Sequence, residues 1–166
     1  MFWLGHMGLG AQAAARVDRS APLKPLLFGT LLPDFLDKPL YYGLSALFHR
    51  RGAALGIIAG TRSFGHTILL TVLVMSLGAR RKSRTLHALG LGMATHLILD
   101  LFTDFCLRRG DFSMRAFAWP LLGWQFPVYP FYGWRDHLSS GRDPFMLVTE
   151  TIGAALLIRA WRRRRA

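Results

Sequence analysis

Cysteine is nearly absent from this chain, since Cys106 is the single thiol among 166 residues. One cysteine excludes an internal disulfide and any zinc motif built from cysteine thiolates. Cys106 itself is expected to be a small buried apolar residue. Histidine and carboxylate side chains are therefore the candidates for chemistry.

Signals for β-strands are also missing. The sequence has no sustained alternation of apolar and polar residues and no NG or DG hairpin dipeptide. It has no low-complexity linker either, so residues 1–166 are expected to form one domain. The apolar residues fall into five segments that are all expected to be helical, which predicts an all-α bundle. These segments are 2–15, 25–32, 64–79, 86–107 and 145–161.

The connections between these segments carry their own signals. Pro33 is expected to end the second helix and leave Asp34 in a turn. Asp143 and Pro144 are typical of a helix start, with the aspartate as cap. Residues 108–144 form an irregular region rich in Trp, Pro, Gly and Tyr. That composition suits an aromatic loop at a membrane surface or over a cleft, and equally a soluble aromatic core.

Acidic residues are scarce, with 9 Asp and Glu against 21 Lys and Arg, for a net charge of +12. Three short blocks, 16–24, 80–84 and 159–166, hold 3, 4 and 5 of the basic residues. Because these blocks lie at the ends of apolar segments, nucleic acid is disfavoured as a partner and membrane lipid is favoured. The positive-inside rule then predicts an integral protein of a bacterial inner (plasma) membrane with its basic ends cytoplasmic. The alternative is a basic amphipathic protein lying on the membrane.

Membrane crossing is expected of one segment above all. Only 86–107 reaches the ~20 residues that a bilayer core requires. The shorter segments are either core helices of a soluble protein or helices that cross part of the membrane and stop at a polar site.

The segment 86–107 also contains two residues that do not suit an apolar helix. His96 and Asp100 are four positions apart, so they lie on one helical face. A buried carboxylate without a partner is costly. The pair can be a hydrogen-bonded structural pair, a proton relay or part of a metal site, and a hydrogen-bonded pair is the commonest of these.

Distances counted along the chain connect this pair with other polar residues. At about 1.5 Å per helical residue, the candidate His or Asp residues lie roughly 15–24 Å from a basic block in four different segments. If the basic blocks share one side, those segments supply a common polar layer. Its candidates are three imidazoles and three carboxylates: His6, Asp34, Asp37, His66, His96 and Asp100.

This donor set suits a divalent ion, zinc first, with manganese or iron as alternatives. Six ligands exceed what one tetrahedral ion needs, so more than one ion is expected. Two-metal sites favour phosphoester hydrolysis, because one ion activates water and both stabilise the oxyanion. Asp37 is expected to be a further ligand or the base that orients the attacking water.

The remaining ionisable residues divide into two kinds. His49, His87 and His137 lie near basic ends or in polar loops, where surface roles are expected. Glu150 lies within the last apolar segment, which makes it a functional candidate, with a structural hydrogen bond as the equal alternative.

Five motifs together resemble the YdjM-like family of LexA-regulated, membrane-bound, metal-dependent hydrolases. They are GHMGLG, LLPDFLD, TRSFGHT, THLILDLFT and WPLLGWQFP, in that order between residues 6 and about 127. The family is distantly similar to zinc-dependent phospholipase C and the P1-type nucleases, which are all-helical with a cluster of zinc ions. The resemblance implies phosphoester hydrolysis.

Three positions depart from the family pattern, because Thr61, Ser63 and Gly65 stand where the family has His, Gly and Thr, and the change at Thr61 matters most. The family block HRG-x-TH opens with a histidine where this chain has Thr61, while Arg62 and His66 are kept. The departure puts the metal count or the rate in question. Arg62 is a candidate for holding a phosphate bidentately beside the ions, with a solvated loop arginine as the alternative.

Taken together, the sequence predicts a metal-dependent hydrolase acting on a phosphoester substrate, which is plausibly lipid-linked, at the membrane surface. Asp37 and Arg62 are its candidate catalytic residues. The alternative is a non-catalytic membrane interaction or regulatory protein whose polar layer is structural or binds metal without turnover.

Overall fold

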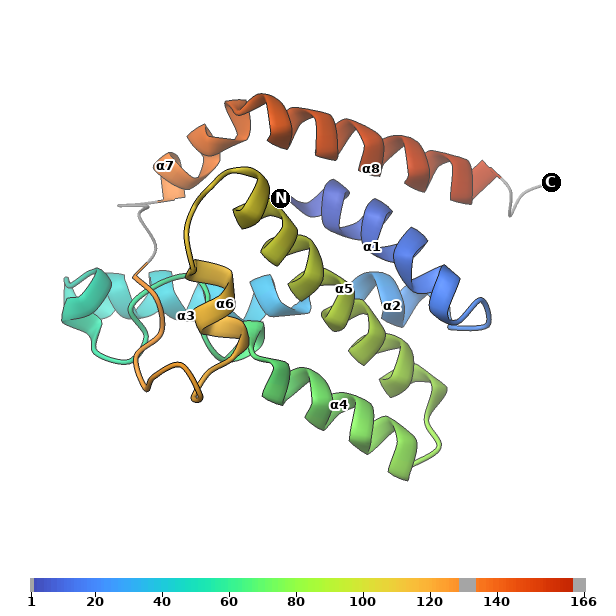
Figure 1. Ribbon diagram of the computed structural model, residues 1–166, viewed down its shortest axis with the longest axis horizontal. Helices are drawn as coiled ribbons and strands as arrows, with labels where there is room; N and C mark the ends of the chain where they lie inside the picture. The colour runs from blue at the N-terminus through green and yellow to red at the C-terminus, as the bar shows by residue number, and fades with distance from the viewer. Residues whose placement is uncertain (1, 129–133, 163–166) are drawn as a thin grey trace.

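The computed structural model describes residues 2–128 and 134–162, and within these ranges it contains helices and no strand (Figure 1). The predicted all-α class is confirmed for this part of the chain. The α-helices are α1 (Trp3–Val17), α2 (Leu23–Gly29), α3 (Leu32–Phe48), α4 (Ile68–Arg80), α5 (Arg84–Cys106), α6 (Phe112–Phe117), α7 (Trp134–Ser139) and α8 (Pro144–Arg162). Three 3₁₀ turns complete them: η1 (Gly52–Leu55), η2 (Phe64–His66) and η3 (Ser140–Arg142).

Helix α5 runs through the middle of the molecule (Figure 1). It packs against α1, α2 and α4, while α8 packs on α1. The α2–α5 contact is unusually close, because a Cβ added at Gly92 would lie 2.3 Å from the carbonyl oxygen of Leu26. This near backbone contact brings the end of α2 beside the His96 turn of α5.

The basic blocks gather at one end of the helices. The last turns of α1, α4 and α8 and the first turn of α5 all lie toward the right of Figure 1. Arg84 joins two of the blocks by donating a hydrogen bond of 2.5 Å to the carbonyl oxygen of Ser20. Arg163, Arg164 and Arg165 of the third block lie outside the described residues.

Two helices, α5 and α8, are long and apolar enough to cross a membrane. A core helix of a soluble protein can be equally long and apolar, but it is mostly buried. Only 17% of the most apolar stretch of α8 is buried. Leu147, Val148 and Ile152 on this helix are exposed. Large exposed apolar surfaces mark contact with lipid or with another protein.

The structure corrects several expected boundaries. Pro33 does not end a helix: it lies in the first turn of α3, where its missing N–H costs nothing, so Asp34 is helical rather than in a turn. The segment 25–32 corresponds only to α2, which ends at Gly29. Helix α3 (Leu32–Phe48) was not expected from the sequence, because it lies between the predicted segments 25–32 and 64–79. Cys106 is exposed rather than buried.

The region 108–144 is less irregular than expected, because α6, α7 and η3 lie in it. Trp119 stacks on Phe126, and both contact Phe64 just before His66. Leu121 and Trp124 are exposed. Residues 129–133 of the aromatic segment lie outside the described residues.

The predicted start of the last helix is confirmed. Helix α8 begins at Pro144, and Asp143 accepts a hydrogen bond of 2.9 Å from the backbone N–H of Phe145. Glu150, for which the sequence left a functional role and a structural hydrogen bond as equal alternatives, has a structural partner. Its carboxylate accepts hydrogen bonds of 2.9 Å from the backbone N–H groups of Phe2, Leu4 and Gly5. The first turn of any α-helix leaves such groups unsatisfied, so Glu150 caps α1 from another helix.

Replacing Glu150 with alanine is therefore expected to lower the free energy of unfolding by about 1–3 kcal/mol, because three donors lose a charged acceptor. Thermal unfolding of the purified protein in detergent measures the change. Thr151→Ala, one position along at an exposed site, is the control and is expected to unfold within about 0.5 kcal/mol of wild type. Equal losses for the two variants would contradict the capping role.

Candidate metal centre

Four elements supply one buried cluster of imidazoles and carboxylates. His6 comes from α1, Asp34 from α3 and His66 from η2, and α5 supplies both His96 and Asp100. None of these five residues is more than 6% exposed. The sixth residue that the sequence analysis placed in this polar layer, Asp37, is also buried and contacts the His66 ring.

Three ligand-type atoms form a nearly equilateral triangle. His96 Nε2 lies 3.3 Å from His66 Nε2, and Asp100 Oδ2 lies 3.5 Å from His66 Nε2 and 3.6 Å from His96 Nε2. Two ligands on a tetrahedral zinc ion, each bonded at about 2.0–2.1 Å, stand about 3.3 Å apart. Direct charge-assisted hydrogen bonds are shorter, at about 2.7–2.9 Å. The spacing therefore fits a shared ion better than direct pairing.

The other two residues extend this triangle on both sides. Asp34 Oδ1 lies 3.6 Å from His66 Nε2, and Asp100 Oδ1 lies 3.3 Å from His6 Nε2. Two groups of three have ligand atoms within 4.8 Å of one another, one made by His6, His96 and Asp100 and the other by Asp34, His66 and His96. His96 belongs to both groups, and Asp100 presents one oxygen to each side.

The outer nitrogens of two histidines are held by the protein. His96 Nδ1 lies 2.7 Å from the carbonyl oxygen of Thr30, which must accept its proton. His66 Nδ1 lies 2.7 Å from Asp37 Oδ2. Each contact places a proton on Nδ1 and points Nε2 into the cluster, where its lone pair can bind a metal ion. Hydrogen-bond partners behind the ligands of metal sites orient histidine rings in the same way.

His6 differs from the other two histidines. Its ring stacks on that of His96, with 3.9 Å between centroids. Its Nδ1 is buried and has no hydrogen-bond partner among the described residues. The stacking fixes the plane of the ring, and Asp100 alone directs its Nε2.

Asp37 lies behind His66, on the side of the ring that carries Nδ1. Its carboxylate accepts hydrogen bonds from the backbone N–H groups of Ser63 at 2.6 Å, Gly65 at 2.9 Å and His66 at 3.2 Å, besides the contact with the His66 ring. It belongs to neither three-residue group. These contacts favour a residue that orients His66 and the η2 turn over a ligand or a base.

The electrostatics of the cluster follow from these contacts. Burial opposes charge on Asp37, but the His66 ring and the backbone donors outweigh it and hold the pKa of Asp37 below its usual value. Burial likewise opposes charge on His66, yet Asp100 and Asp37 raise the pKa of His66 to about 9. Burial also opposes charge on Asp34, but the Lys38 ammonium and the histidines lower the pKa of Asp34. The carboxylates are therefore ionised at neutral pH.

Arg62 is a buried residue rather than a solvated one. Its Nε lies 3.1 Å from Asp100 Oδ2, and its Nη1 lies 2.6 Å from Asp104 Oδ2. The Ser113 hydroxyl also contacts Nη1. The guanidinium thus lies between two carboxylates. These contacts favour a role for Arg62 in holding Asp100 in place over a role in binding a phosphate. Thr61, which precedes Arg62 in the chain, is also buried. It stands where the YdjM-like motif has a histidine.

Sequence analysis missed two charged members of this site. Asp104 is buried and accepts hydrogen bonds from Ser113, and Lys38 lies 2.6 Å from Asp34 Oδ2. Both had a signal in the sequence, because each stands four residues beyond a candidate ligand on the same helical face.

Counting charges shows what the cluster lacks. Four carboxylates (Asp34, Asp37, Asp100 and Asp104) face two cations (Lys38 and Arg62), which leaves two negative charges once a metal ion replaces the proton that the raised pKa of His66 otherwise holds. Uncompensated buried charge is strongly unfavourable. One divalent cation would balance the set.

The other histidines lie away from the cluster. His49 is exposed and follows α3 with a left-handed φ of 51°. The His87 ring is 44% exposed and lies 3.8 Å from Asp18. The side chain of His137 lies outside the described residues.

Comparisons with known proteins found no match: no family model, no curated protein and no solved structure is similar to this chain. The resemblance to the YdjM-like family remains a prediction from the five motifs.

Proposed function

We propose that this protein is an integral membrane hydrolase that cleaves a phosphoester bond with a divalent metal ion. The triangle of His66 Nε2, His96 Nε2 and Asp100 Oδ2 is the observation that carries the proposal. Zinc is preferred because the donor set combines imidazole nitrogen with carboxylate oxygen at tetrahedral spacing. Manganese and iron are the alternatives. The motif resemblance to the YdjM-like hydrolases supports the same class.

The residues around the triangle have separate tasks. His66, His96 and Asp100 would hold the ion, and Asp37 and the Thr30 carbonyl would orient the two rings. When bound, the ion would supply an activated water and stabilise charge on the phosphoryl oxygens. Arg62 keeps Asp100 in place.

Lys38 is the most exposed charged group of the cluster, with a side chain 21% exposed. Its ammonium lies at the rim beside Asp34, so an anionic substrate approaching from this side would meet a cation first. We therefore assign substrate attraction to Lys38 rather than to Arg62.

The charge count bears on the number of ions. One divalent ion neutralises the two excess negative charges, so we propose one resident ion at the triangle. A second ion between His6, His96 and Asp100 would leave an excess of two positive charges, which an anionic phosphoester would offset. The second ion is therefore expected to bind together with substrate.

Membrane location rests on exposed apolar surface. Helices α5 and α8 have the length and composition of membrane spans, and α8 is mostly exposed. The basic ends would be cytoplasmic in a bacterial inner membrane by the positive-inside rule. A substrate with a lipid-linked phosphate would reach such a site from the bilayer.

A second candidate function is favoured by the burial of the cluster. None of the five residues His6, Asp34, His66, His96 and Asp100 is more than 6% exposed. Such enclosure suits a structural metal layer in a non-catalytic membrane interaction or regulatory protein. Turnover decides between the two functions.

The deciding experiment is hydrolysis of bis(p-nitrophenyl) phosphate and of a phospholipid by the protein purified in detergent. We expect turnover that stops with chelator and returns with zinc or manganese. Asp34→Asn, beside the triangle, is expected to lower kcat by about 10–100-fold, which is the usual cost of changing a residue next to the ligands of a metal site. Asp111→Asn, at an exposed aspartate, is the matched control. A metal-loaded protein without chelator-sensitive turnover on either substrate supports the non-catalytic function instead.

A further inference from the structure

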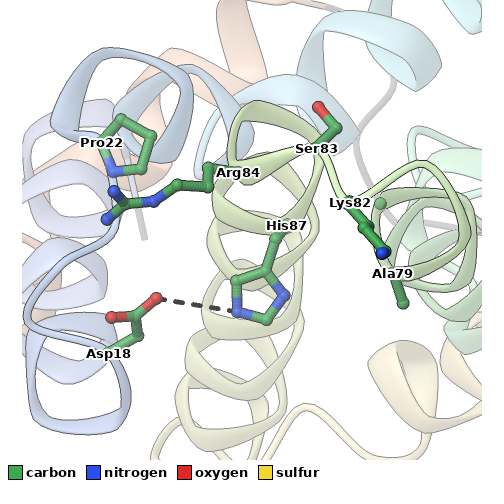
Figure 2. Close-up of a pocket in the computed structure, with 8 residues that line it drawn as sticks. Asp18, Pro22, Ala79, Lys82, Ser83, Arg84 and His87 are labelled. Atoms are coloured by element: carbon green, nitrogen blue, oxygen red, sulfur yellow. Dashed lines mark ion pairs between the residues drawn. The ribbon is translucent and has the colours of Figure 1, made fainter.

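A second site lies at the basic end of the molecule, away from the metal centre. There the connection between α1 and α2, the end of α4 and the start of α5 enclose a cavity of about 200 Å³ (Figure 2). Pockets for whole small molecules are usually about 300–1,000 Å³, so this one suits a group the size of a headgroup. Its lining residues are Asp18, Pro22, Gly78, Ala79, Lys82, Ser83, Arg84 and His87.

Positive charge dominates this cavity. Asp18 and His87 face each other across it, and Arg84 reaches toward the α1–α2 connection, where it bonds to Ser20 (Figure 2). Lys82 lies on the α4 side, exposed, with no ion-pair partner among the described residues. Lys82 and Arg84 outweigh Asp18, and three further exposed arginines adjoin the cavity in sequence: Arg19, Arg80 and Arg81.

Apolar surface continues from the cavity along α4. Gly78 and Ala79 at the end of this helix line the cavity, and Leu69, Val72, Leu73 and Leu77 of the same helix are exposed. An apolar helix that ends at a cationic pocket is complementary to a phospholipid, because the acyl chains can lie along the helix while the phosphate meets the cations.

We propose that this cavity binds the phosphate of an anionic phospholipid. The site does not depend on the proposed hydrolase activity: Arg84 and His96 are 12 residues apart on α5, or roughly 18 Å. Neither Lys82 nor Arg84 contacts a member of the metal centre in any described interaction. The lipid at this end would be a bound neighbour that holds the α1–α2 connection against α4 and α5, not a substrate.

Native mass spectrometry of the full chain in detergent tests the proposal, with phosphatidylglycerol and phosphatidylcholine as probes. Phosphatidylglycerol is expected to bind at least about fivefold more tightly. Each cation at a membrane surface contributes about a fivefold gain in binding. Lys82→Gln is therefore expected to weaken phosphatidylglycerol binding about fivefold and Lys82→Gln with Arg84→Gln about 25-fold. Asp18→Asn is expected to strengthen it.

Arg159→Gln is the matched control, because Arg159 is exposed at the same end but does not line the cavity. It is expected to bind as wild type does. Equal affinity for the two lipids, or equal behaviour of the Lys82 and Arg159 variants, would overturn the proposal. Full competition by inorganic phosphate alone would also overturn it, by assigning the cavity to a soluble anion. The metal content of every variant should match that of wild type. A variant that keeps its metal but binds less lipid is still folded, so its loss of lipid binding is specific to the cavity.

Discussion

Replacing His96 with alanine is expected to remove the resident metal ion from the purified protein. His96 belongs to both groups of ligand-type atoms found among the described residues, so its removal takes one of three ligands from each group. Changes to the second shell alone cost 10–100-fold in affinity, so loss of a ligand should cost more than ~100-fold. Metal analysis after exposure to a chelating resin should fall from about one ion per chain to below about a tenth.

His87→Ala is the matched control for this experiment. His87 lies on the same helix, nine positions earlier, but its ring is 44% exposed and lies 3.8 Å from Asp18, away from the cluster. Its replacement should leave the metal content unchanged. Stoichiometric zinc or manganese in the His96 variant would refute the centre, whereas loss in both variants would point to unfolding, which circular dichroism detects. His96→Gln, which keeps most of the volume, repeats the test without a cavity.

Replacing Arg62 with methionine is expected to lower the free energy of unfolding by about 3–5 kcal/mol. The substitution leaves Asp100 and Asp104 buried without their shared cation, and an unpaired buried carboxylate is far costlier than a lost surface pair. Arg62 makes contacts of 3.1 and 2.6 Å to these two groups. Thermal unfolding in detergent measures the loss.

Two further variants separate charge from packing at this position. Arg80→Met removes an exposed arginine and should change stability by about 0.5 kcal/mol or less. The double variant Arg62→Met with Asp104→Leu removes cation and carboxylate together, and should recover part of the loss because a buried pair can be replaced by apolar residues of similar volume. An Arg62→Met protein as stable as the Arg80→Met protein would show that the guanidinium does not neutralise the carboxylates. Metal bound in excess of wild type by Arg62→Met would indicate that the arginine occupies the place of a cation.

Much of the candidate site could be predicted because its signals are local. A histidine or aspartate within an apolar helical run stands out without any tertiary information, as His96 and Asp100 do. Counting helical rise from the basic blocks then placed His6, Asp34 and His66 at a similar depth, and the structure brings these residues together. Residues four positions apart on a helix share a face, so the same reasoning applied to Asp100 and Asp34 would have found Asp104 and Lys38.

The roles of the residues could not be predicted, because they depend on which atoms meet. Asp34 and Asp37 lie in the same motif, LLPDFLD, and look alike in the sequence. The oxygens of Asp37 nevertheless contact the η2 backbone and the His66 ring. The Thr30 carbonyl that orients His96 carries no side-chain signal at all. The partners of Arg62 lie 38 and 42 residues further along the chain, so no local pattern pairs them with it.

The sequence by itself determined the all-helical class, the three basic blocks and the polar residues inside apolar helices. Helix formation and charge placement depend on residues near one another in the chain, so their pattern is visible in one dimension. Tertiary structure alone decided that Pro33 lies in the first turn of a helix, that Glu150 caps α1 from 145 or more residues away, and that three ligand atoms stand at the spacing of a tetrahedral ion. These features depend on the packing of whole helices, where close approach at residues such as Gly92 sets distances that no local pattern contains.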